Sequence, residues 1–144
     1  MILYLDTSSL VKLYVAEGAS AEVRTLAEKA ELLATSVLAY PEARSAFARL
    51  QREGLLTESA GASLRAELDL DWPHLLAIDL SEAIWRQAGD LAERHALRAL
   101  DSLHLASFLA LTVADLGVPA RFSTFDERLD AAARRELSSA DDPP

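Results

Sequence analysis

The chain has 144 residues, a length that suits one domain with one hydrophobic core. Its formal net charge is −9 at pH 7, which argues against a protein that coats nucleic acid through bulk positive charge but leaves a local site possible. It has no cysteine, so neither disulfides nor a thiolate metal site support the fold. No apolar stretch approaches the roughly 20 residues that cross a bilayer, and we expect a soluble protein in the cytoplasm.

Short apolar segments alternate with helical patterns along the chain. The predicted strands cover residues 2–5, 32–35, 75–79 and 120–124. Because strands alternate with helices, the pattern predicts an α/β fold in which helices cover a parallel sheet. We expect a single domain over residues 1–137 and a disordered tail at 138–144.

Capping residues mark the starts of several predicted helices. Ser36, Thr57 and Ser81 stand where an N-cap is expected, and Thr124 with Glu127 forms a T-x-x-E capping box before the last helix. The predicted helices cover 9–17, 21–31, 36–53, 57–72, 81–97, 99–116 and a segment from 124 onward.

Acidic residues stand where the predicted sheet has its carboxyl edge, the side on which open parallel sheets bind ligands. Asp6 directly follows the first strand, and Asp126 follows the strand "ARFST" by two positions. Asp101 falls near the start of the helix after "ALRAL". Glu42 lies about one and a half turns into its helix, and no neighbour three or four positions away is basic, so it has no local ion-pair partner.

For each aspartate taken alone, helix capping is at least as good an explanation as a role in a functional site. A carboxylate at a helix start accepts hydrogen bonds from backbone N–H groups and stabilises the helix by about 0.5 to 2 kcal/mol. If all four acids converge, however, two like charges about 4 Å apart cost on the order of 4 kcal/mol at an effective dielectric near 20. Some acids must then protonate, or a cation must bind. An all-oxygen donor set favours Mg²⁺ or Mn²⁺ over zinc and indicates phosphoryl or phosphodiester chemistry.

Four segments carry these acids, and the match runs from residue 2 to about 135. They read "YLDTSSLVKLYVAE", "ATSVLAYPEARSAFAR", "ALDSLHLA" and "FSTFDERLDAAA". In order and spacing they resemble the four acidic motifs of the PIN-domain family, specifically the VapC-type toxin ribonucleases of type II toxin–antitoxin systems. The resemblance implies a three-layer α/β/α fold with a central, mainly parallel sheet of four to five strands. It also implies a Mg²⁺- or Mn²⁺-dependent endoribonuclease that hydrolyses phosphodiester bonds in RNA and acts as a toxin.

The resemblance also assigns roles and partners. The catalytic and metal-binding residues that it implies are Asp6, Glu42, Asp101 and Asp126. Asp6 and Asp101 would be the main ligands, while Thr7 and Thr124 would support them with their hydroxyls. Pro41 departs from the family pattern, in which an ordinary helix former is more usual before the glutamate. A bend at Pro41 would change the direction of the Glu42 carboxylate. The implied partners are an RNA substrate, a cognate VapB-like antitoxin and a second copy of the chain, with no membrane.

Two other classes of function stay open. A phosphotransfer or phosphatase domain also places an aspartate after its first strand, but "LDTSS" has no second acid within two positions of Asp6. A catalytically silent binding module with a PIN fold is the other, and the presence of all four acids counts against it. His104 stands one turn after Asp101. We interpret it as a half-buried core histidine rather than as a proton carrier.

Overall fold

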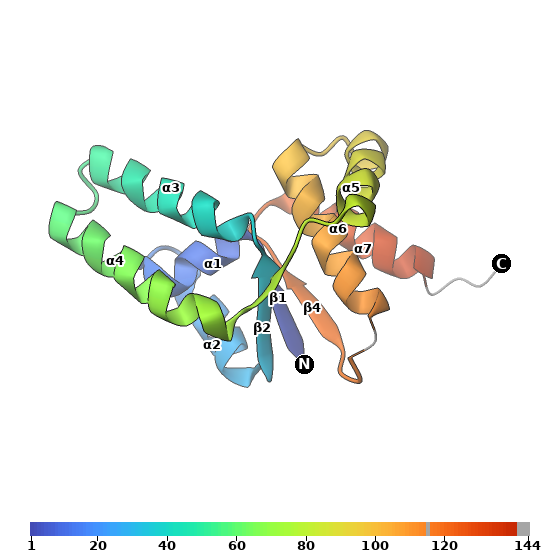
Figure 1. Cartoon of the computed structure of the whole chain (residues 1–144), viewed down its shortest axis with the longest axis horizontal. Coiled ribbons are helices and arrows are strands. Elements are labelled where there is room, and N and C mark those ends of the chain that lie inside the picture. Colours follow the sequence, from blue (N-terminus) through green and yellow to red (C-terminus); the bar gives the residue numbers. More distant parts are fainter. Residues whose placement is uncertain (115, 141–144) are drawn as a thin grey trace.

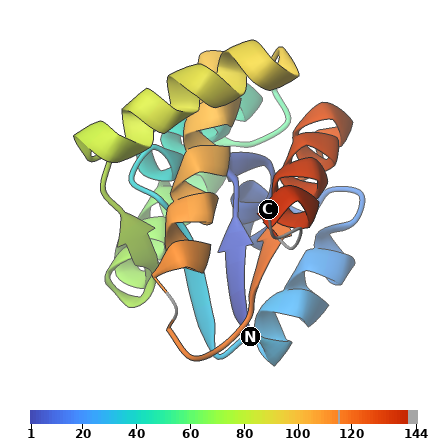
Figure 2. The ribbon, with the colours of Figure 1, turned by 90° about the vertical axis from the view of Figure 1, so that its right-hand side faces the viewer.

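In the computed structural model, which describes residues 1–114 and 116–140, one parallel sheet lies at the centre of the fold. Its strands are β1 (Ile2–Leu5), β2 (Leu32–Ser36), β3 (Leu76–Ile78) and β4 (Ala120–Ser123). Their order is β3-β2-β1-β4, and each neighbouring pair is parallel, so all four carboxyl ends meet at one edge (Figure 2). The predicted strands are confirmed, with ends that differ by at most one residue.

Helices cover both faces of this sheet. They are α1 (Thr7–Tyr14), α2 (Ser20–Lys29), α3 (Ala39–Arg52), α4 (Glu58–Asp71), α5 (Glu82–His95), α6 (Ala99–Val113) and α7 (Glu127–Ala140), with a short 3₁₀ turn at Trp72–His74. Helices α1 to α4 lie on one side and α5 to α7 on the other, so the expected three-layer α/β/α arrangement is confirmed (Figure 1). No single helix in the described ranges is long and apolar enough to cross a membrane; α5 and α6 reach that length and composition only as a pair bent by 118°.

Strand β1 holds the layers together because its side chains alternate between the two cores. Ile2 and Tyr4 pack among residues of α5, α6 and α7, whereas Leu3 and Leu5 pack among residues of α1 and α2. All four are almost fully buried, and each such apolar side chain contributes about 1.5 to 3 kcal/mol. The strand is central in the sheet, so the residue that follows it, Asp6, lies in the middle of the carboxyl edge.

Helix α3 begins later than the sequence predicts. Ser36 is the last residue of β2, where it pairs in register with Ile78, and the helix starts at Ala39. The prediction of Ser36 as the N-cap was therefore wrong, because sheet pairing extended over the capping residue. The later start places Pro41 in the first turn, where a backbone N–H has no helical partner, so the proline costs the helix no hydrogen bond.

The start of α7 also differs from the prediction. Asp126, not Thr124, caps this helix, because its Oδ1 accepts a hydrogen bond from the Leu129 N–H at 2.9 Å. The hydroxyl of Thr124 instead accepts from the Asp126 N–H and donates to Asp6. The helix continues to Ala140, so residues 138–140, which we expected to begin a disordered tail, are helical; residues 141–144 lie outside the described part of the chain.

Glu136 links α7 to α5, and this contact gives a pH-dependent prediction. Its Oε1 lies 2.8 Å from Nη1 of Arg94 and 2.5 Å from Nε2 of His95. Burial alone would raise the pKa of Glu136, but the hydrogen bonds from His95 and Arg94 outweigh it and lower the pKa. The stabilisation is therefore complete above the ordinary carboxyl pKa and is lost as the pH falls through the lowered value.

We expect Glu136→Gln to reduce the free energy of unfolding at pH 7 by about 1 to 2 kcal/mol, because the charged acceptor is lost. The difference from wild type should shrink as the pH falls and wild-type Glu136 takes up a proton. Urea denaturation at neutral and acidic pH measures it, and a deficit of constant size at every pH would contradict the assignment.

Candidate functional site

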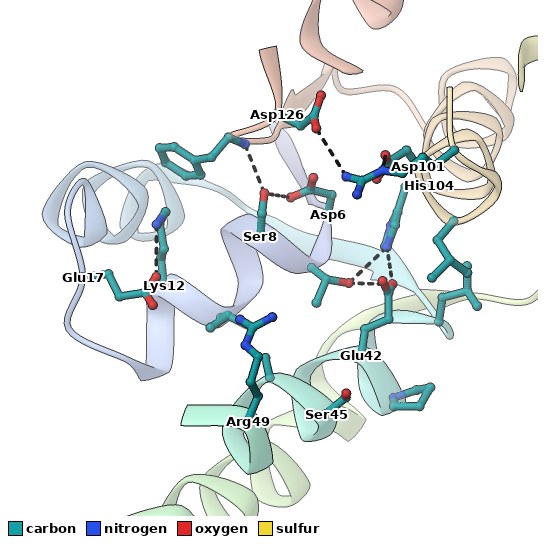
Figure 3. A pocket seen from close by; sticks show the side chains of 18 of the residues that line it. Asp6, Ser8, Lys12, Glu17, Glu42, Ser45, Arg49, Asp101, His104 and Asp126 are labelled. Atoms are coloured by element: carbon teal, nitrogen blue, oxygen red, sulfur yellow. Dashed lines mark hydrogen bonds and ion pairs between the residues drawn. The ribbon is translucent and has the colours of Figure 1, made fainter. Parts of the chain in front are cut away.

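One pocket at the carboxyl edge of the sheet has acids from four elements in its wall. Its volume is about 830 Å³, within the usual range of small-molecule sites. All four acids expected from the sequence line it, namely Asp6, Glu42, Asp101 and Asp126, and Glu17 lines it as well. The four expected acids come from the end of β1, from α3, from α6 and from the residue before α7, and Figure 3 shows them around the same space. The fold thus gathers side chains that are up to 120 residues apart (126 − 6).

Asp6 is the most buried of these acids, with only 4% of its surface exposed. Its Oδ1 accepts hydrogen bonds from the Ser9 N–H at 2.9 Å and the Ser8 hydroxyl at 2.7 Å, and its Oδ2 accepts from Thr124 at 2.5 Å. Burial raises the pKa of the Asp6 carboxyl, because water no longer solvates the charged form, and the three hydrogen bonds offset this only in part. Asp6 therefore caps α1. Its charged form is also unfavourable because it is poorly solvated, and a bound cation would stabilise it.

Glu42 is held by two donors. The Thr7 hydroxyl donates to its Oε1 at 2.8 Å, and Nε2 of His104 lies 2.8 Å from the same atom. Burial alone would raise the pKa of Glu42, but the hydrogen bonds from His104 and Thr7 lower it below the ordinary value, so this carboxylate is charged at neutral pH. Thr7 thus contacts Glu42, as Thr124 contacts Asp6.

Asp101 and Asp126 share one basic neighbour. Arg98 places Nε at 3.1 Å from Asp101 and Nη2 at 3.7 Å from Asp126. The Arg98 side chain is 81% exposed, and such solvent-exposed ion pairs contribute only about 0 to 1 kcal/mol. Asp101 does not cap its helix, because the N-cap position of α6 is Arg98 and has no side-chain hydrogen bond to the helix. The capping explanation that fits Asp6 and Asp126 therefore does not extend to Asp101.

Basic and aromatic side chains stand beside the acids. Lys12 and Arg49 line the same pocket, and Lys12 is paired with Glu17 at 3.2 Å. The Lys12 Nζ also lies 4.6 Å from the ring centre of Phe125, an aromatic side chain with 41% of its surface exposed. Figure 3 shows Arg49 directed from α3 into the pocket. A chain with a strongly negative total charge therefore still presents local positive groups that a phosphate could meet.

The donor chemistry of the pocket fits a hard divalent cation, but the side chains are not arranged around one. Carboxylate oxygens are the ligands that Mg²⁺ and Mn²⁺ prefer. Within residues 1–114 and 116–140, no three acidic or histidine side chains lie close enough together to hold a metal ion. Two of the four acids are instead paired with Arg98. Arg98 contacts Oδ2 of each acid, so an ion bound between Asp101 and Asp126 would compete with the arginine for these oxygens.

Sequence reasoning missed several residues of this site. Arg98 carries a signal, because a basic residue three positions before Asp101 falls on the same helix face. Tyr4 carries a weaker one, since a tyrosine inside a buried strand needs a partner for its hydroxyl. His104 was expected to be half-buried; it is 2% exposed and hydrogen-bonded to Glu42. The contacts of Tyr4 and His104 join residues far apart in the sequence, so spacing alone could not pair them.

Comparison with known proteins identifies the family. Residues 3–135 match the model described as the PIN domain. The chain belongs to the PIN-domain family. It is 36% identical over 132 residues to ribonuclease VapC45 and to ribonuclease VapC49, both from Mycobacterium tuberculosis, and this match covers 92% of the chain and 89% of each relative. The resemblance to VapC-type PIN domains is confirmed.

Solved structures with the same fold support this assignment. The crystal structure of M. tuberculosis VapC20, described as a sarcin–ricin loop cleaving toxin, aligns with a TM-score of 0.65 at 19% identity, over 90% of this chain and 94% of that one. The crystal structure of FitAcB from Neisseria gonorrhoeae aligns with a TM-score of 0.64 at 22% identity, over 93% and 94%. At these identities the structures establish a shared fold and nothing further.

The burial of Asp6 gives a prediction about the stability of this PIN domain. The pKa of Asp6 is raised in the folded protein, so stability is highest below the ordinary carboxyl pKa and is lost as the pH rises through the raised value. We expect Asp6→Asn to raise the melting temperature of the metal-free protein at pH 7. The gain should vanish at a pH below the ordinary value.

Added Mn²⁺ should reverse the order of stability, because it binds the wild-type pocket and not the variant. Differential scanning calorimetry with and without Mn²⁺ tests both effects. If the variant is less stable than wild type at pH 7 without metal, the buried charge of Asp6 does not destabilise the fold, and the prediction is wrong.

Proposed function

We propose that this PIN-domain protein is a divalent-metal-dependent endoribonuclease that acts as the toxin of a toxin–antitoxin pair. One observation carries the proposal: acids from four separate elements line a single pocket in a chain of this family. Relatives at 36% identity are named ribonucleases. The basic side chains at the rim, Lys12 and Arg49, would bind the phosphates of an RNA strand beside the acids.

In this proposal Asp6 and Asp101 hold the ion, and Glu42 and Asp126 complete the acidic pocket directly or through water. When bound, Mg²⁺ or Mn²⁺ supplies Lewis-acid polarisation of a phosphodiester group. The chain's own residues prepare the site. The hydroxyl of Thr124 and the backbone of α1 fix the Asp6 carboxylate, so the ligand does not have to be ordered when the ion arrives.

The partners follow from the same resemblance. We propose a cognate VapB-like antitoxin that covers the acidic pocket, and a second copy of the chain as a homodimer partner. Both the RNA substrate and the antitoxin would be met in the cytoplasm. The structure titled VapBC2 from Rickettsia felis, bound to a DNA fragment from their promoter, aligns with this chain at a TM-score of 0.56, 15% identity and 86% coverage of this chain (100% of that one).

One observation favours a catalytically silent binding module instead. Arg98 lies between Asp101 and Asp126, and the described residues contain no group of three donors close enough for an ion. A silent module would keep this internal pairing permanently. A nuclease would exchange the weak, exposed arginine contacts for a divalent cation, and the two readings therefore differ in whether Mn²⁺ binds at all.

RNA cleavage tests the proposed function. We expect the wild-type protein, freed of antitoxin, to cut RNA in the presence of Mg²⁺ or Mn²⁺ and to stop when the ion is removed with EDTA. Asp6→Asn and Asp101→Asn should each lower the rate at least about 100-fold while the protein stays folded, because each removes a charged ligand of the ion.

The matched control is Asp90→Asn, which changes an exposed aspartate on α5 in the same way. It should cleave RNA at the wild-type rate. Cleavage that survives EDTA, or that persists in Asp6→Asn, would overturn the metal-dependent assignment. A wild-type protein that neither binds Mn²⁺ nor cleaves any RNA would favour the binding module.

A further inference from the structure

His104 connects three layers of the structure at the floor of the pocket. It projects from α6 and is almost fully buried, with 2% of its surface exposed. Its Nδ1 lies 3.0 Å from the Tyr4 hydroxyl on β1. Its Nε2 lies 2.8 Å from Oε1 of Glu42 on α3 and 3.1 Å from the Thr7 hydroxyl on α1. Figure 3 shows the ring directed toward Glu42. Both ring nitrogens therefore have a hydrogen-bond partner in the protein.

Of the contacts of the His104 ring, the one with Glu42 has a fixed donor. The Tyr4 ring is fixed between Phe108 and Phe122, at centroid distances of 5.8 and 5.5 Å. The Tyr4 hydroxyl lies 3.0 Å from Nδ1 of His104, and either group can be the donor in this contact. The contact with Glu42 is fixed by chemistry, because a carboxylate oxygen only accepts hydrogen bonds; Nε2 therefore carries a proton and donates it to Oε1.

Glu42 receives its two donors on the same oxygen. Thr7 and His104 both contact Oε1. Across the described ranges, no hydrogen bond to a protein group ends on Oε2 of Glu42. Fixing one carboxylate oxygen from behind while the other stays available is how outer hydrogen bonds orient the ligands of a metal site. Pro41, directly before Glu42, does not provide this orientation, because it lies in the first turn and changes no helical hydrogen bond.

We propose that His104 is a positioning residue for the ion site: it donates from Nε2 to Oε1 of Glu42 and thereby presents Oε2 to a divalent cation. The inference rests on the proposed metal-dependent function. It assigns His104 no contact with RNA and no proton transfer. The requirement is a hydrogen-bond donor at the place of Nε2, and any side chain that supplies one there should substitute for the imidazole.

The experiment compares side chains of equal length with and without that donor. His104→Gln places an amide N–H near the position of Nε2, whereas His104→Met has nearly the same shape and no donor. The readout is the affinity for Mn²⁺, measured by isothermal titration calorimetry on the full chain, with circular dichroism and thermal denaturation to establish folding. We expect His104→Met to weaken Mn²⁺ binding at least tenfold and His104→Gln to stay within about threefold of wild type.

Two further variants complete the test. His104→Asn carries an amide that reaches only the depth of Nδ1, so it should bind Mn²⁺ as weakly as His104→Met, and it replaces that variant if methionine prevents folding. His95→Gln is the matched control, because His95 is a buried histidine that contacts Glu136 through Nε2, away from the pocket. It should leave the affinity for Mn²⁺ unchanged.

The inference is overturned if a folded variant without the donor binds Mn²⁺ within threefold of His104→Gln, whether both bind tightly or both bind weakly. Equal weakness would mean that the imidazole or its packing matters rather than the donor. Wild-type protein that neither binds Mn²⁺ nor cleaves RNA would instead refute the proposed function. If the inference holds, RNA cleavage by His104→Met should recover as Mn²⁺ is raised to saturation, whereas Asp6→Asn should not recover.

Discussion

The buried carboxylate of Asp6 is the constraint on which the site depends. It stands directly after the central strand, where it accepts hydrogen bonds from the first turn of α1 and from Thr124 after β4. Those contacts fix the carboxyl edge of the sheet around a group whose ionised form is poorly solvated. An ordinary capping residue would not have to be buried to this degree. The cost of keeping a charge there is understandable if a cation shares the site.

The main features of the fold were predictable because they depend on local patterns and on one rule of topology. The apolar run at Ile2–Leu5 predicted β1, and the alternation of strands with helices predicted the parallel sheet. That topology alone was enough to expect Asp6 and Asp126 at one edge. The predicted N-caps of α3 and α7 were wrong because contacts with distant residues took their place. Ser36 pairs with β3 as part of β2, and the hydroxyl of Thr124 donates to Asp6.

The polar network beneath the pocket could not be predicted from the sequence. Spacing along a helix revealed that His104 follows Asp101 by one turn, and an apolar neighbourhood suggested a core position. The position is in the core, but its partners, Tyr4 and Glu42, lie 100 and 62 residues away. Such pairs form only after the layers pack, so no local pattern records them. The same limit applies to Arg98, whose second acid, Asp126, comes from another element.

The central claim is that these acids together bind a divalent cation. The most direct measurement is a crystal structure of the antitoxin-free protein with Mn²⁺, in which anomalous scattering locates the ion. The account predicts a Mn²⁺ ion bound by Asp6 and Asp101, with Arg98 turned away from Asp101. An Mn²⁺-saturated crystal in which Arg98 still bridges Asp101 and Asp126, and no anomalous peak lies in the pocket, would contradict it.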